Sequence, residues 1–98
     1  MNFYKQRLLS VLYEARGLVS LPGNDFVWSS WEDAEAAVRE LDYWIEALQS
    51  EKEINPGNME ILFAPTGPMQ EVSLSSGWGN AFLKLADRFD AAASKFSP

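Results

Sequence analysis

Apolar residues recur at intervals of three and four positions in three stretches of the chain, and each stretch predicts an amphipathic helix. The predicted helices span residues near 2–18, 30–49 and 77–96. Each has one apolar side, and three such sides can close a helical bundle around a shared core. The three apolar stripes are Tyr4, Leu8, Val11, Leu12 and Ala15; Trp31, Ala34, Val38, Leu41, Ile45 and Leu48; and Trp78, Phe82, Leu85, Phe89, Ala92 and Phe96.

The start of the second predicted helix has a recognisable capping pattern. Ser29 is a favourable N-cap residue, and Glu32 follows three positions later, so the pair predicts a capping box. Just before it, Phe26, Trp28 and Trp31 fall within six residues. We expect these aromatic side chains to fold the preceding loop back over the core, because aromatic residues contribute large burial energies. The alternative is an exposed aromatic contact patch.

The chain between the second and third predicted helices has a different pattern. Two short apolar runs, 59–63 and 69–74, flank the Pro- and Gly-containing residues 64–68. This arrangement predicts a small β-hairpin across 59–74, and the alternative is an ordered extended segment without ladder pairing. The expected fold is therefore mainly α, of the α+β class: a three-helix bundle with a small β-hairpin between helices two and three. Residues 1–98 are expected to form a single domain.

Composition excludes several kinds of chemistry. The chain has no cysteine and no histidine, which removes disulfides, thiolate catalysis, the commonest general base and the commonest metal ligand. Glu60 and Glu71, one on each arm of the predicted hairpin, are the best carboxylate pair for hydrolysis, but such residues are more often exposed rim groups. We therefore predict a protein that is not an enzyme, with no catalytic residue, no metal site and no cofactor.

The cellular location of the protein is also predicted from sequence features that are absent. The first residues have no long apolar stretch of the signal-peptide kind, and no apolar run approaches the roughly 20 residues that span a bilayer. The absence of cysteine fits a reducing compartment, so a cytoplasmic location is expected. The net charge of −6 makes nucleic acid and anionic membrane surfaces unfavourable partners.

The net charge is concentrated in one segment. Residues 32–53 carry eight acids and two bases, which accounts for the whole net charge of −6. Glu35, Asp42 and Glu46 point away from the apolar stripe, and Tyr43 projects beside them. Concentrated charge steers association with a partner of opposite sign, and an exposed Tyr is a common interface anchor. We therefore predict Glu35, Asp42, Tyr43 and Glu46 as partner-binding residues, although such a face is often only solvated.

Three blocks of sequence contain most of the Pro, Gly and Trp residues. They are NDFVWSSW at 24–31, LFAPTGP at 62–68 followed by Gln70 and Glu71, and SGWG at 76–79. Together they cover about a fifth of the chain, and they resemble signature blocks of a group of small bacterial proteins of unknown function. The resemblance implies a bacterial, cytoplasmic protein and brings no activity with it.

Three functions fit these observations. The first is a small binding protein that neutralises a basic protein partner, as bacterial immunity proteins and antitoxins neutralise cationic toxins. The second is a homo-oligomeric structural or adaptor module, such as a homodimer, in which Tyr43, Leu83 or the aromatic loop forms a symmetric contact. The third is a small-molecule pocket between the hairpin and the helices.

Overall fold

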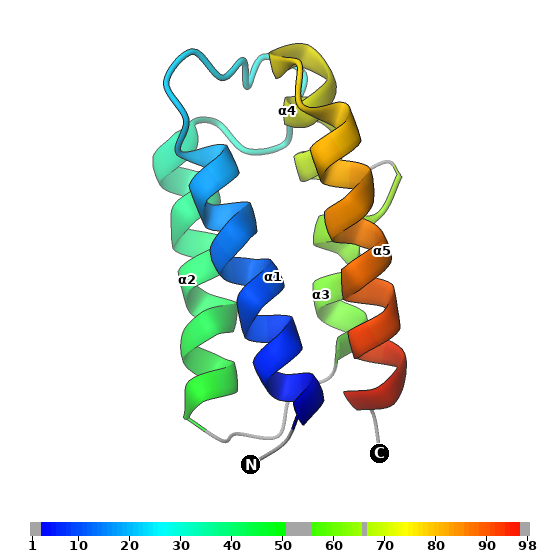
Figure 1. Ribbon diagram of the computed structural model, residues 1–98. Helices are drawn as coiled ribbons and strands as arrows, with labels where there is room; N and C mark the ends of the chain where they lie inside the picture. Colours follow the sequence, from blue (N-terminus) through cyan, green and yellow to red (C-terminus); the bar gives the residue numbers. More distant parts are fainter. Residues whose placement is uncertain (1–2, 51–55, 66, 97–98) are drawn as a thin grey trace.

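The computed structural model describes residues 3–50, 56–65 and 67–96, which form five helices (Figure 1). The first predicted helix is α1, which spans Phe3–Val19, and the third is α5, which spans Gly79–Phe96. The second is α2, which spans Ala34–Gln49. Helix α1 packs against both α2 and α5, and the two short helices described next pack against α5.

The predicted three-helix bundle with a β-hairpin is wrong, because the described part of residues 59–74 contains no strand. It belongs to two short helices, α3 over Pro56–Phe63 and α4 over Pro68–Ser76. The buried side chains reveal the helical period: Met59, Leu62 and Phe63 in α3, and Met69, Val72 and Ser73 in α4. Each set follows the i, i+3, i+4 spacing of one helix face, whereas a strand would bury alternate residues.

The corner between α3 and α4 explains why these runs are helical. Gly67 is the N-cap of α4, and Pro68 occupies the first turn, where its missing N–H group costs nothing. The Gly67 amide donates a hydrogen bond to the Ala64 carbonyl oxygen at 2.9 Å, which closes a tight turn. A Cβ atom on Gly67 would lie 2.2 Å from the Ile61 carbonyl oxygen, so the two helices approach each other closely here.

The start of α2 also differs from the prediction. Asp33, and not Ser29, is the N-cap, and its carboxylate accepts a hydrogen bond from the Ala36 amide at 2.9 Å. The predicted capping box is therefore wrong. Ser29 instead donates its hydroxyl to the Pro68 carbonyl oxygen at 3.0 Å and accepts from the Trp31 amide at 3.1 Å. Its side chain ties the loop to α4 and does not begin a helix.

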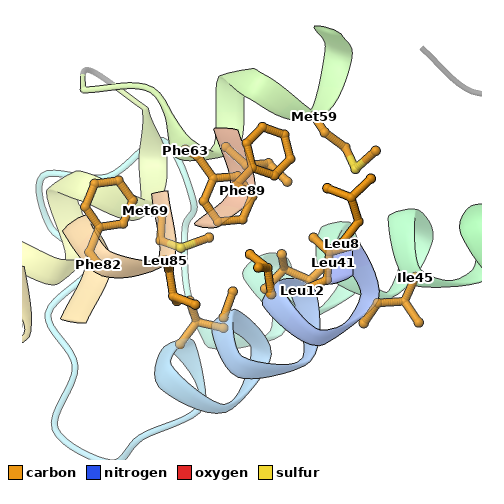
Figure 2. Close-up of a cluster of buried hydrophobic side chains, with 14 of the residues drawn as sticks. Leu8, Leu12, Leu41, Ile45, Met59, Phe63, Met69, Phe82, Leu85 and Phe89 are labelled. Atoms are coloured by element: carbon orange, nitrogen blue, oxygen red, sulfur yellow. The ribbon is translucent and has the colours of Figure 1, made fainter. Parts of the chain in front are cut away.

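The core contains buried side chains from all five helices (Figure 2). Phe63 of α3 stacks on Phe89 of α5, with ring centroids 4.4 Å apart and an interplanar angle of 14°. Val38, predicted at the centre of the α2 stripe, is only half-buried, and Ala37 is fully buried in its place. The other predicted contact residues are buried: Leu41, Ile45, Phe82, Leu85 and Phe89.

Candidate partner-binding surface

All four predicted partner-binding residues lie on the exposed side of α2. Glu35, Asp42 and Glu46 are exposed, and Tyr43 is 64% exposed. At about 100° per residue, the three acids share one flank of the helix, while Tyr43 lies almost opposite the buried Leu41. The structure therefore brings the acids together and leaves the tyrosine beside them.

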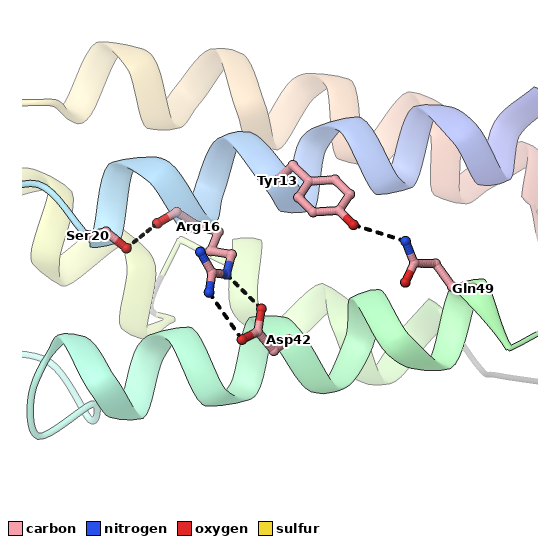
Figure 3. Close-up of polar contacts among 5 residues, drawn as sticks. All are labelled: Tyr13, Arg16, Ser20, Asp42 and Gln49. Carbon is pink, nitrogen blue, oxygen red and sulfur yellow. Dashed lines mark hydrogen bonds and ion pairs between the residues drawn. The ribbon is translucent and has the colours of Figure 1, made fainter.

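Asp42 has a role that the sequence does not reveal, because its carboxylate is held by Arg16 of α1 (Figure 3). The Arg16 Nε donates to Asp42 Oδ1 at 2.7 Å, and Nη2 donates to Oδ2 at 3.4 Å. This hydrogen bond and the nearby negative charge raise the pKa of the Arg16 guanidinium above its ordinary value. The charge of Asp42 is thus compensated from a neighbouring helix, which reduces its contribution to the acidic field.

A second polar contact joins the same two helices. Gln49 at the end of α2 donates its side-chain amide to the Tyr13 hydroxyl of α1 at 2.9 Å (Figure 3). The flank of α2 that carries Asp42 therefore borders α1, and Asp42 is part of a seam between helices. Glu35 and Glu46 remain as the outward acids of this flank.

Of the outward residues, Glu35 is held only weakly by its neighbour, whereas Tyr43 is packed against another aromatic ring. Glu35 lies 4.0 Å from Arg39, and both side chains are more than two-thirds exposed, so this ion pair contributes little. Tyr43 packs edge-on against the half-buried Trp44, with ring centroids 5.0 Å apart and an interplanar angle of 83°. An exposed ring already oriented by its neighbour loses less entropy when a partner covers it.

A groove of about 360 Å³ adjoins this surface where the start of α2 lies near the end of α1. Its lining combines Glu35 and Arg39 with the apolar Ala34 and Val38, and Ser20 contributes from beyond α1. A partner side chain that enters the groove would contact the same acid that steers its approach. The groove therefore extends the candidate surface beyond the four predicted residues.

The three Pro-, Gly- and Trp-rich blocks meet at one end of the molecule. Residues 20–33 cross this end beside α4 (Figure 1). Trp78 donates its indole N–H to the Asn24 side-chain oxygen at 2.9 Å, and the Asp25 amide donates to the Ser76 hydroxyl at 2.9 Å. With the bond from Ser29 to α4, these contacts join blocks that lie 39–54 residues apart in the sequence.

We refer to residues 20–33, which contain Phe26, Trp28 and Trp31, as the aromatic loop. Some of its aromatic side chains lie in the core and one lies in solvent. Trp31 is buried and donates its indole N–H to Glu40 at 2.9 Å, and Phe26 packs partly buried against the core. Trp28 is 72% exposed, and the neighbouring Val27 is 78% exposed. The expectation that the aromatic residues fold back over the core is therefore correct for Trp31 and Phe26 and wrong for Trp28.

Other chemistry has little support in the described residues. Glu60 lies on α3 and Glu71 on α4, so the hairpin that would have placed them opposite each other is absent there. The described residues contain no group of three or more acids arranged to hold a metal ion. None of the helices in the described ranges combines the length and the apolar character needed to cross a bilayer.

Comparison of the chain with protein-family models, with curated proteins and with solved structures gave no match. The resemblance of the three blocks to small bacterial proteins therefore stays a prediction. Function must be inferred from the surfaces that the fold presents.

Proposed function

We propose that the protein is a small binding protein that neutralises a basic protein partner through the exposed side of α2, as an immunity protein or antitoxin does. The observation that carries this proposal is the position of Tyr43, which is exposed opposite the core, on the same outward side of α2 as the exposed acids Glu35 and Glu46. An aromatic anchor on the same side of a helix as exposed acids suits a cationic surface that has an apolar centre.

The surface would act in two steps. The acids would raise the rate of encounter with a basic partner, because charge of opposite sign guides diffusion before contact. Tyr43 would then lose its exposed area to the partner and slow dissociation. Neither step requires a catalytic group, a metal or a cofactor, and neutralisation follows when the partner's own functional surface is covered.

The decisive experiment compares two charge-reversal variants of the full chain. Glu35→Lys with Glu46→Lys reverses the proposed surface, and Asp87→Lys with Asp90→Lys makes the same change in net charge on α5. Asp42 is left intact because its carboxylate holds Arg16. Each variant and the native protein serve as bait in an extract of the source organism. A basic protein that the α2 variant fails to retain is then purified.

Binding kinetics of that purified protein test the mechanism. Association with the α2 variant should be about tenfold slower at low salt, and the difference should shrink at high salt, since screening removes the steering. The α5 variant should bind with an almost native rate. Tyr43→Ala should mainly speed dissociation. Equal association rates for the α2 and α5 variants would contradict the proposal.

A further inference from the structure

The tip of the aromatic loop is an exposed apolar turn that several hydrogen bonds hold in place. The Ser29 amide donates to the Phe26 carbonyl oxygen at 3.0 Å, which closes a turn with Val27 and Trp28 at its centre. The Val27 amide donates to the Asp25 carboxylate at 2.9 Å. Because Asp25 and Ser29 are also bonded to α4, the turn is fixed on both sides before any partner arrives. We refer to Val27 and Trp28 as the turn tip.

Charge is segregated around this tip. Between Arg16 and Arg39 the chain has no base and four acids, and three of these acids, Asp25, Glu32 and Asp33, lie within five residues of Trp28. Helices α1 and α5, by contrast, contain six bases and three acids, a net charge of +3. The turn tip is therefore close in sequence to acids and to no base, whereas the surface formed by α1 and α5, which we refer to as the basic face, has a net positive charge.

The basic face contains a groove of matching character. A depression of about 540 Å³ runs between α1 and α5, and we refer to it as the α1–α5 groove. Lys84 lies at the groove, where Arg88 is held in an ion pair with Glu14. Its apolar lining consists of Gly17, Leu18, Leu21, Ala81 and Leu85.

We propose that the turn tip of one copy of this chain inserts into the α1–α5 groove of a second copy. Trp28 would contact the apolar lining with its indole near Lys84, where the ammonium group interacts favourably with the aromatic face. Asp25, Glu32 and Asp33 would lie beside the basic face. The two surfaces are complementary in both polarity and charge, which favours this pairing over contact with a neutral surface.

The contact must be head-to-tail. A symmetric contact between two tips would bring the same three acids of both copies together, and like charges at an interface oppose association. A head-to-tail contact leaves one tip and one groove free in every pair, so assembly continues beyond two copies. This differs from the symmetric homodimer suggested by the sequence, and it does not depend on the partner proposed for α2.

The size of the tip sets the strength of the contact. Two side chains bury far less than the roughly 800 Å² per partner of a standard stable interface. We therefore expect dissociation constants between about 0.1 and 1 mM, which correspond to weak contacts. The association is then visible only at high protein concentration and low salt.

Sedimentation of the full chain over a concentration series tests the proposal. At about 0.02 mM the native protein should sediment near its monomer mass of 11.0 kDa, and at about 1 mM the weight-average mass should rise about twofold or more. Trp28→Ala should remove the rise, and so should Leu21→Glu with Lys84→Glu in the groove. Tyr43→Ala and Lys95→Glu are controls for an exposed aromatic residue and for a charge on α5, and both should associate as the native protein does.

A mixture of the two defective variants gives the sharpest result. The Trp28→Ala protein keeps its groove, and the groove variant keeps its tip, so an equal mixture should form pairs that do not grow further. Amide resonances near Trp28 in one variant and near Ala81 in the other should shift only on mixing. A native protein that stays monomeric at about 1 mM, association that survives Trp28→Ala, or a mixture without pairs would each overturn the proposal.

Discussion

Replacement of Gly67 by Ala tests the corner between α3 and α4 directly. The added Cβ atom would lie 2.2 Å from the Ile61 carbonyl oxygen and 3.2 Å from the Ala64 carbonyl oxygen. Both are backbone atoms, so no side chain can rotate away. The backbone conformation of Gly67, with φ −81° and ψ 172°, is open to any residue, and the obstacle is therefore space alone.

The expected cost follows from the movement that this substitution forces. An ordinary contact requires the corner to open by about 1 Å, which strains the packing at a cost of about 1–3 kcal/mol. The same movement stretches the bond between the Gly67 amide and the Ala64 carbonyl oxygen, worth about 1 kcal/mol. We expect Gly67→Ala to lower the free energy of unfolding by about 2–4 kcal/mol, a large part of the stability of a typical domain.

Urea denaturation followed by circular dichroism measures this loss, with two other glycines as controls. Gly77 has φ +86° and open space around its Cα atom, so Gly77→Ala should cost only the strain of a left-handed residue, about 1 kcal/mol. Gly17 lies within α1 with no atom near its added Cβ, so Gly17→Ala should stabilise by up to about 1 kcal/mol. If Gly67→Ala changes stability by less than Gly77→Ala, the close approach of α3 and α4 is refuted.

Two smaller effects test other contacts. Asp33→Ala should lower the free energy of unfolding by about 1 kcal/mol and speed hydrogen exchange of the Ala36 amide. Ser29→Ala should lower it by a similar amount without that local effect. Faster exchange at Ala36 in the Ser29 variant alone would show that Ser29 is the cap. The hydrogen bond from Arg88 lowers the pKa of Glu14. The ionised pair therefore stabilises the folded protein fully above the ordinary carboxyl pKa, and this stabilisation is lost as the pH falls through the lowered pKa. Because both side chains are about half exposed, we expect this pair to change the free energy of unfolding by well under 1 kcal/mol between pH 7 and about pH 3. Arg88→Met should flatten that part of the pH profile.

The long helices were predictable because their patterns extend over several turns. Helices α1, α2 and α5 contain 16–18 residues each, so the apolar period repeats often enough to define a face. Helices α3 and α4 contain eight and nine residues, and an apolar run of that length is equally typical of a buried strand. The position of Pro68 directly after Gly67 was the local signal for a helix start.

The exposed side of α2 was also predictable from the helical period. The contacts between residues far apart in the sequence were not. Helical geometry alone places Tyr43 opposite Leu41. The partner of Asp42 is Arg16, 26 residues earlier, and no local pattern links the two. Trp28 is exposed because contacts of its loop with α4 fix the turn, and those contacts depend on how α4 and α5 pack.

The hydrogen bonds that fasten residues 20–33 also bear on the order of folding. Their partners are 39, 51 and 54 residues apart, so closing them carries a high loop entropy and needs α4 and α5 in place. We expect the loop to become ordered after the transition state for folding. Weakening these bonds would then leave the folding rate almost unchanged and raise the unfolding rate. The loop would thus act on the lifetime of the folded protein more than on the speed with which it forms.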